Sequence, residues 1–335
     1  MKKIINRAES FETDFMEGIE LAYGDRVKVL DPDKRILLRN TPVREGKVGV
    51  VTGGGSGHLP MFLGYVGQGM LDGCAVGNVF ASPPSNKMFD MIRACDHGSG
   101  VLCLYGNYGG DCMNFDMACE MADLEAIKTA TVLVGDDIAS AVKGAEERRR
   151  GVAGMLYAFK VAGAAAEMGK SLEEVASATK KALQNIRTMG VALTPCIVPR
   201  VGKPTFHINE DEIEIGMGIH GEPGIQIHKM MTADEIAGFM VEKLLADMPV
   251  ESGEEVSVMI NGLGSTPLEE QLIVYRFVAK TLMDRGIRLY MPHIGEFATS
   301  MEMAGLSVTL FRLDEELKQY LDVPASTPFY TNSYK

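Results

Sequence analysis

Apolar and polar positions along this chain form two kinds of pattern, short apolar runs and longer stretches with helical periodicity. The apolar runs with strand character are "VGVVT" (48–52), "GVLCLY" (100–105), "TATVLVG" (129–135), "VSVMIN" (256–261), "IRLYM" (287–291) and "SVTLFRL" (307–313). Their interleaving with helical stretches is typical of an α/β protein, in which helices cover the faces of a sheet.

Two capping boxes mark where helices begin. Ser171 starts the first, and the apolar positions after it follow a helical stripe as far as Ile186, so we expect this helix to be stopped by Gly190. Thr232 starts the second box and predicts another helix there.

The stretch between these two helices divides the chain. Residues 189–224 contain four prolines and show no helical period, and the alternation of strands and helices resumes after them. We therefore predict two α/β domains, each a sheet flanked by helices, over residues 1–189 and 190–335.

The composition excludes several classes of protein. The 335 residues are 46% hydrophobic, enough for two packed cores, and the formal net charge is −12. Such a charge argues against a nucleic-acid or anionic-membrane surface, because both depend on clustered Lys and Arg. The six cysteines show no C-x-x-C spacing and no targeting segment is visible, so we expect a reduced, cytoplasmic location. No Cys/His cluster has metal-ligand spacing, so no intrinsic metal or cofactor is expected.

The first candidate for chemistry is "VGVVTGGGSGHLP" (48–60), in which a strand runs into glycines and then His58. Glycines after a strand let backbone N–H groups approach a ligand, most often a phosphate. The dinucleotide fingerprint would need glycine at position 58, and the P-loop needs a Gly-Lys-Ser/Thr ending that is absent. The loop therefore points to a ligand held beside a titratable imidazole.

Two more loops resemble sites. In "YGNYGGDCMNFD" (105–116) a strand ends in a glycine-rich turn that carries Asp111, and α/β proteins place ligands at such strand ends. The alternative is that Asp111 caps a helix starting near Asn114, and local sequence leaves both interpretations open. In "GIHGEPG" (218–224) flanking glycines and a rigid Glu-Pro-Gly turn suit the presentation of the His220 imidazole.

Two charged groups are weaker candidates. The pair Asp136-Asp137 follows a strand and is interpreted as a helix cap or solvated turn. The run Arg148–Arg150 is interpreted as a solvated helix end, as most charge runs are.

The three loops stand in an order that resembles the dihydroxyacetone kinase family, specifically its substrate-binding K subunit. Four further stretches are similar to that family: "RRRGVAGMLYAFKVAGAAAEMG" (148–169), "VPRVGKPTF" (198–206), "NGLGSTPLEE" (261–270) and "SMEMAGLSVTL" (300–310). The resemblance spans nearly the whole chain and implies two α/β domains in a homodimer that binds a short ketose.

The resemblance also implies a role for each site residue. His220 would attack the ketone carbon and form a covalent hemiaminal, Asp111 would accept the proton of the terminal hydroxyl, and His58 would orient the sugar and act as acid or base. The implied substrate-binding set is Gly54, Gly55, Ser56, Gly106 and Asn107. A free carbonyl is present only in open-chain ketoses, so short sugars would be selected over hexoses that cyclise.

The phosphoryl donor has no visible site in this chain. The resemblance therefore implies a nucleotide-binding L-type partner subunit that carries ADP or ATP with Mg²⁺, within glycerol metabolism. Whether a phosphoenolpyruvate-driven phosphotransferase system or ATP supplies the phosphoryl group stays open, as does the ketose, dihydroxyacetone or a four-carbon relative such as erythrulose.

Two other functions compete with the kinase subunit. One is a non-catalytic paralogue that binds ketose and activates a transcriptional regulator, and the other is an α/β ligand-binding protein without covalent chemistry. Asp111 favours the enzyme, because a sensor needs no base.

Two positions depart from the family pattern. Gly106 stands where the family usually has a lysine, and Leu59 where it usually has a glutamate. Both changes remove charge, and we expect the volume beside Gly106 to be open to an extra carbon of the substrate. The alternative is that Tyr105 or Asn107 fills this volume.

Overall fold

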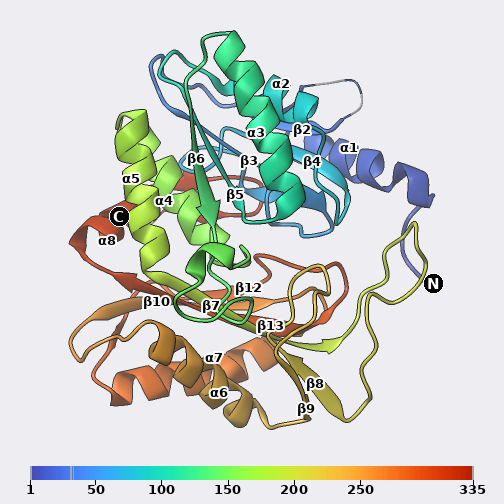
Figure 1. Cartoon of the computed structure of the whole chain (residues 1–335), viewed down its shortest axis with the longest axis vertical. Helices are drawn as coiled ribbons and strands as arrows, with labels where there is room; N and C mark the ends of the chain where they lie inside the picture. The colour runs from blue at the N-terminus through green and yellow to red at the C-terminus, as the bar shows by residue number, and fades with distance from the viewer. Residues whose placement is uncertain (1, 31, 33, 334–335) are drawn as a thin grey trace. The chain divides into compact units, whose positions relative to one another are not determined.

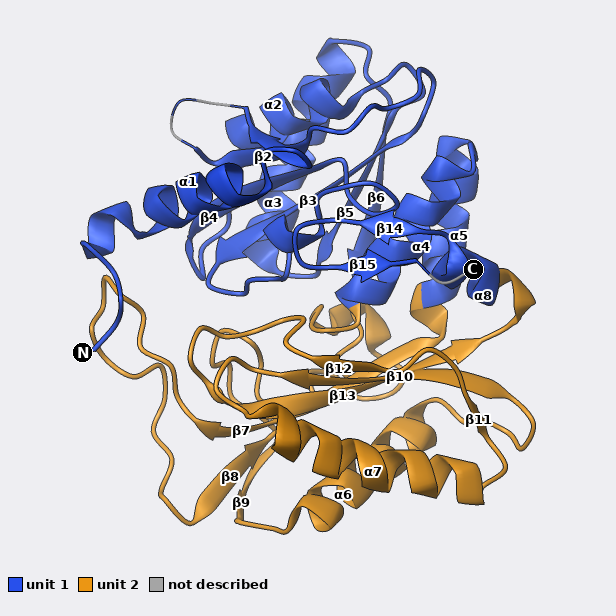
Figure 2. Cartoon of the chain, turned by 180° about the vertical axis from the view of Figure 1, so that it is seen from behind, with its two compact units in different colours: residues 1–134, 155–182, 317–335 blue, residues 135–154, 183–316 orange. Residues whose placement is uncertain are grey.

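The computed structural model describes residues 2–30, 32 and 34–333 and divides into two compact units (Figure 2). Unit 1 comprises residues 1–134, 155–182 and 317–335, and unit 2 comprises residues 135–154 and 183–316. Each unit has its own helix-flanked sheet, which confirms the α/β class.

These units differ from the predicted division at 189/190. That point lies inside one strand of unit 2, and the C-terminal segment of the chain returns to unit 1. The excursion of residues 135–154 into unit 2 is a second difference. Neither crossing has a local sequence signal, because each depends on which distant residues the segment packs against.

The six-stranded sheet of unit 1 has the order β1-β2-β4-β3-β5-β6. Strands β3 to β6 pair in parallel, whereas β1 and β2 are antiparallel additions at one edge. Because the chain passes from β3 to β4 on one side and then to β5 on the other, the carboxyl ends of β3 and β5 form a topological switch point, where α/β sheets bind ligands. The strands are β1 (Val27–Val29), β2 (Ile36–Arg39), β3 (Gly49–Ser56), β4 (Gly73–Val79), β5 (Val101–Gly106) and β6 (Thr129–Val134).

The helices of unit 1 cover both faces of this sheet. On one face α2 and α3 pack with alternate residues of β5, Val101, Cys103 and Tyr105, in one apolar core. The intervening β5 residues point to the opposite face, where α4 packs against β3 and β5. The helices are α1 (Phe11–Tyr23), α2 (Ser85–Cys95), α3 (Gly109–Leu124), α4 (Met155–Glu167), α5 (Leu172–Gln184) and α8 (Glu315–Asp322), with short 3₁₀ turns at Ala8–Ser10 and Leu63–Tyr65 and a ribbon of β14 (Ala325–Ser326) and β15 (Thr331–Asn332).

Unit 2 is built on a seven-stranded, largely antiparallel sheet of order β11-β10-β13-β7-β8-β9, with β12 also paired to β10. Two helices, α6 and α7, lie side by side against it (Figure 1) and share its apolar core. The elements are β7 (Ile186–Thr194), β8 (Glu212–Ile215), β9 (Gln226–Lys229), α6 (Ala233–Asp247), β10 (Glu255–Gly262), α7 (Leu268–Asp284), β11 (Arg288–Leu289), β12 (His293–Gly295) and β13 (Ala304–Leu313), with a 3₁₀ turn at Glu146–Arg148.

Most predicted elements are present, and one helix boundary is wrong. The two capping boxes form, at Ser171 and Thr232, and all six apolar runs contain strands, although the run at 287–291 forms only the two residues of β11. The helix that begins after Ser171 ends at Gln184, and both Ile186 and Gly190 lie in β7. Pairing with β13 explains the difference, because Gly190 stands opposite Ser307 in that ladder and a strand partner overrides a local helical pattern.

None of the helices in the described part of the chain is both long enough and apolar enough to span a membrane.

Candidate functional site

The glycine run after Thr52 belongs to strand β3. The sequence suggested instead that these glycines form a loop after the strand. A Cβ atom on Gly54 would lie 2.5 Å from the Phe62 ring, and one on Gly55 would lie 2.7 Å from the backbone nitrogen of Ala81. Both glycines are therefore required by close packing of the next two segments onto the strand, whatever else they bind.

His58 is buried just beyond β3, with 1% of its surface exposed. Its imidazole stacks on Phe80, with ring centroids 4.9 Å apart and planes at 23°, and meets the edge of Phe62 at 6.1 Å. Both phenylalanines have positive φ, 59° and 70°, a conformation that bulky residues rarely adopt. The fold thus holds two strained aromatic residues to confine one imidazole.

Ser56 is the last residue of β3, and its side chain forms a hydrogen bond to β4. Its hydroxyl donates to the backbone oxygen of Gly77, and its own backbone oxygen accepts from the Phe80 N–H at 3.0 Å. Because the hydroxyl proton is already used, a ligand could only donate to this oxygen.

Asp111 is the third residue of α3 and is buried, with 6% exposure. The helix begins at Gly109 after Tyr108, so the interpretation of Asp111 as the cap of a helix starting near Asn114 is wrong. The Asn114 side chain instead donates to the backbone oxygen of Pro83 at 2.9 Å. A carboxylate in the first turn is stabilised by the positive end of the helix dipole.

Gly106 ends β5, and the space beside it is filled. A Cβ atom there would lie 3.0 Å from the ring of Tyr108 and 3.4 Å from the sulfur of Met155. The expectation of an empty volume is therefore wrong, and the residue that occupies it is neither Tyr105 nor Asn107. Tyr105 points to the other face of the sheet, where its ring stacks on Phe115 at 4.0 Å.

Asn107 follows β5 and is tied to the next strand and the next helix. Its backbone N–H donates to the Val134 oxygen at 3.0 Å, and its side-chain oxygen accepts from the Cys112 thiol at 3.8 Å. Unit 1 thus places His58 and Asp111 after β3 and β5, neighbouring parallel strands whose carboxyl ends lie at the same sheet edge.

His220 belongs to a tight loop of unit 2, in which it makes two contacts with the Glu222 carboxylate. The backbone N–H of His220 donates to Oε2 of Glu222 at 3.0 Å, and its ring Nδ1 lies 2.8 Å from Oε1. A Cβ atom on Gly218 would lie 2.1 Å from the same carboxylate, so glycine is required there. Because a carboxylate only accepts, Nδ1 carries a proton, and in the neutral imidazole the lone pair is then on Nε2.

The Glu222 carboxylate is ionised over a wide pH range. Burial alone would raise the pKa of Glu222, but the hydrogen bond and charge of His220, with the charge of Arg150, lower this pKa to about 2. Arg150 lies 3.8 Å from Oε2 of Glu222 and donates to Asp137 at 3.0 Å and to the Gly216 oxygen at 3.4 Å. Burial, opposed by Arg150, raises the pKa of Asp137 to about 6.

Sequence reasoning missed these supporting residues. From the sequence, Glu222 is interpreted only as part of a turn. Its position two residues after His220 is the signal that could have identified it as the partner of that histidine. The interpretation of Arg148–Arg150 as a solvated face is wrong for Arg149, which is 1% exposed and forms a bidentate pair with Asp247 at 3.0 and 2.5 Å. The interpretation of Asp136 as part of a solvated turn is also wrong. Its carboxylate is buried and accepts hydrogen bonds from two backbone N–H groups at 2.8 Å.

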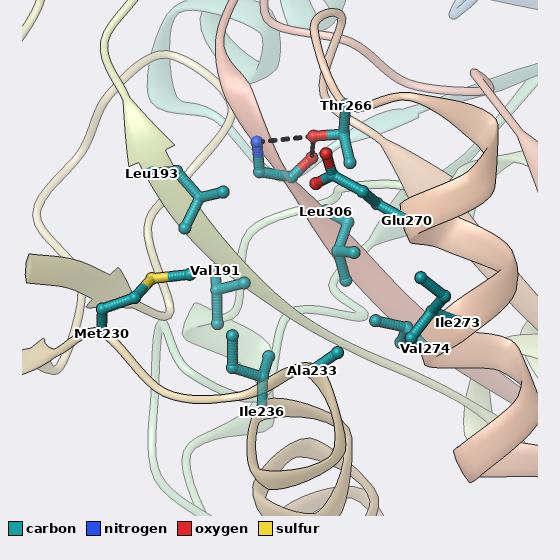
Figure 3. A pocket seen from close by; sticks show the side chains of 11 residues that line it. Val191, Leu193, Met230, Ala233, Ile236, Thr266, Glu270, Ile273, Val274 and Leu306 are labelled. Atoms are coloured by element: carbon teal, nitrogen blue, oxygen red, sulfur yellow. Dashed lines mark hydrogen bonds between the residues drawn. The ribbon is translucent and has the colours of Figure 1, made fainter.

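Unit 2 also contains an apolar cavity of about 110 Å³ between α6, α7 and strands β7 and β13 (Figure 3). Val191, Ile236 and Leu306 are among its lining residues, and the Thr266 hydroxyl at its rim bonds the backbone of Gly305. The predicted site residues lie elsewhere in the chain.

An imidazole and a carboxylate lie near one topological switch point, and switch points are where α/β proteins bind small ligands. Comparison with known proteins gives the family: the Dak1 domain matches residues 17–329. A protein of Listeria innocua serovar 6a is 44% identical over 98% of this chain and 99% of its own length, and is named PTS-dependent dihydroxyacetone kinase 2, dihydroxyacetone-binding subunit DhaK. This chain therefore belongs to the dihydroxyacetone kinase family, which confirms the resemblance seen in its loops.

Other relatives differ in length and in named role. The L-erythrulose kinase of Pectobacterium atrosepticum is 42% identical over 98% of this chain, which spans 56% of that protein. A solved structure titled dihydroxyacetone kinase operon co-activator is 34% identical with a TM-score of 0.90, covering 96% of this chain and 98% of its own. The dihydroxyacetone kinase of C. freundii has the same TM-score, 0.90, at 32% identity, covering 99% of this chain and 60% of its own.

Proposed function

We propose that this chain is the ketose-binding subunit of a dihydroxyacetone-type kinase and that it holds its substrate covalently on His220. The observation that carries the proposal is the contact of Nδ1 with Glu222, which leaves Nε2 as the nucleophilic nitrogen. The substrate is dihydroxyacetone, named for the Listeria relative, or erythrulose, named for the Pectobacterium one.

The covalent step uses residues of the His220 loop. Nε2 adds to the ketone carbon, the carbon–oxygen double bond becomes a single bond, and the oxygen takes up a proton. The imidazole gains positive charge as the new bond forms, and the Glu222 carboxylate beside Nδ1 stabilises that charge. Nδ1 keeps its proton in the adduct, so the hemiaminal stays paired with the ionised Glu222 carboxylate.

The residues of unit 1 act on the sugar hydroxyls. Asp111 accepts the proton of the terminal hydroxyl as that oxygen attacks the phosphoryl group, and His58 supplies a proton and orients the sugar. The backbones of Gly54 and Gly55, the Ser56 oxygen, and the loop of Gly106 and Asn107 bind the remaining hydroxyls. Burial of His58 and Asp111 supports these roles. Packing already restricts buried side chains, so little conformational entropy is lost when they position a substrate.

The nucleotide belongs to a partner in this proposal. We infer an L-type subunit that carries ADP or ATP with Mg²⁺, supported by a C. freundii dihydroxyacetone kinase structure whose title names AMP-PNP and Mg²⁺ and of which this chain covers 61%. The homodimer, the cytoplasmic location and the role in glycerol metabolism stay predictions from the resemblance.

The test is a ketose complex of the full chain. A crystal soaked with dihydroxyacetone should show continuous density between Nε2 of His220 and the ketone carbon, and native mass spectrometry should show one added ketose. His220→Ala should abolish the adduct. His228→Ala, which removes an exposed histidine of β9, should keep it. A ketose lying unbonded beside His220, or an adduct that survives His220→Ala, would contradict the proposal.

The co-activator relative gives the second candidate function, a ketose sensor that acts on transcription. The two functions separate on phosphorylation: with a nucleotide-bearing partner subunit present, a sensor binds ketose without turnover. The buried Asp111 favours the kinase, because a sensor has no proton to remove from the substrate.

A further inference from the structure

Two cysteine thiols touch inside unit 1, away from the ketose loops. Cys103 lies in the middle of β5 and Cys119 in the second half of α3, the helix that lies along the sheet (Figure 1). Their sulfur atoms are 3.8 Å apart, which is van der Waals contact. Cys103 is fully buried, whereas Cys119 is partly exposed.

The two thiols differ in acidity. The hydrogen bond from Cys103, opposed by burial and assisted by the hydroxyls of Thr129 and Thr131, lowers the pKa of the Cys119 thiol to about 7. The same contact with Cys119, together with burial, raises the pKa of Cys103. A large fraction of Cys119 is therefore thiolate at neutral pH, while Cys103 is a thiol.

Cys119 is partly exposed and lies beside the edge strand of the sheet. Thr129 and Thr131 lie on β6, the last strand of the unit 1 sheet, and Thr131 is exposed. A partly exposed thiolate with a second thiol in contact is the arrangement found at redox-sensitive cysteine pairs, where the first sulfur reacts and the second resolves.

We propose that Cys103 and Cys119 are a reversible oxidation site, which hydrogen peroxide or an organic hydroperoxide converts to an intramolecular disulfide. The Cys119 thiolate attacks one peroxide oxygen, the oxygen–oxygen bond breaks, and the sulfur becomes a sulfenic acid while water or an alcohol leaves. Cys103 loses its proton as its sulfur attacks that of Cys119, the sulfur–oxygen bond breaks, and a water leaves. The two thiols lose two electrons together, and a dithiol reductant restores them.

The step is compatible with the fold. A disulfide needs sulfur atoms about 2.05 Å apart, so they must approach by less than 2 Å, which side-chain rotation and a small shift of α3 can supply. The cross-link would join α3, which begins at the Asp111 turn, to β5, which ends at Gly106. Oxidation would therefore couple the two elements that carry one of the ketose loops.

The test is thiol mapping of the full chain after limited treatment with hydrogen peroxide. We expect loss of two thiols, a disulfide-linked pair of peptides containing Cys103 and Cys119, and recovery with dithiothreitol. In the untreated protein, alkylation of Cys119 should accelerate with pH and reach half its limiting rate near pH 7. Cys119→Ser should abolish both the disulfide and the pH-dependent alkylation. In Cys103→Ser no disulfide should form, and Cys119 should be oxidised beyond the sulfenic acid.

The matched control is Cys112→Ser, on the same helix. Cys112 is also partly exposed, but burial and nearby Asp111 raise its pKa, and its sulfur contacts Asn107. This variant should form the disulfide at the wild-type rate. Peroxide-treated wild-type protein in which Cys103 stays fully alkylatable after denaturation, or in which the disulfide joins two chains, would overturn the proposal whether or not the ketose adduct exists.

Discussion

The charge on Glu222 should set how tightly His220 holds a ketose, and Glu222→Gln tests this. Glutamine keeps the size of the side chain, and its oxygen can still accept from Nδ1. Its NH2 group cannot accept from the His220 backbone N–H, so that contact is lost together with the negative charge. The charged imidazole formed during addition then loses its stabilising partner.

The magnitude follows from the carboxylate itself. The pKa of Glu222 is about 2 rather than the ordinary 4.5, which corresponds to about 3 kcal/mol of preference for its charged form. Hydrogen bonds to charged groups contribute about 2 kcal/mol, and we assign this value to the contact of Glu222 with the charged imidazole. Ketose affinity should fall roughly 30-fold.

Calorimetric titration of dihydroxyacetone into each variant measures this change. Glu210→Gln is the matched control, because Glu210 is an exposed carboxylate of the same unit, and it should bind like the wild type. Glu222→Gln protein that is folded and binds within twofold of the wild type would refute the reasoning.

The same contact predicts a pH dependence of folding. Since folding lowers the pKa of Glu222, its contribution to stability is complete above about pH 4.5 and is lost as the pH falls toward 2. In acid denaturation followed by circular dichroism, the difference in unfolding free energy between wild type and Glu222→Gln should therefore shrink across this interval.

Three further predictions concern turnover and packing. Asp111→Asn should lower kcat by roughly 10² or more with the nucleotide-bearing partner present while ketose binding persists, and near wild-type turnover would exclude Asp111 as the base. The purified chain alone should not phosphorylate ketose with ATP and Mg²⁺, and robust activity without a partner would contradict a separate nucleotide subunit. Gly54→Ala should destabilise the protein by about 1–3 kcal/mol, because the new Cβ would meet the Phe62 ring, whereas Gly18→Ala, with no atom within 4 Å of its Cβ in helix α1, should be neutral or stabilising in thermal unfolding.

The sequence by itself determined the α/β class and the three glycine-rich segments that carry His58, Asp111 and His220. Six strands contain short apolar runs and two helices start at capping boxes, so these elements can be read from neighbouring residues. His58 and Asp111 could be singled out because they come within a few residues of the ends of β3 and β5, and strand ends are where parallel sheets bind ligands.

Only the tertiary structure decided the features that depend on distant partners. Gly190 ended a helical pattern in the sequence but lies in β7, because residues more than a hundred positions away pair with it. Arg149 belonged to a charge run, yet Asp247 brings it into the interior. The space beside Gly106 depended on where the Tyr108 ring turns. In each case the deciding contact is made by packing or pairing in space, which local propensity and spacing do not encode.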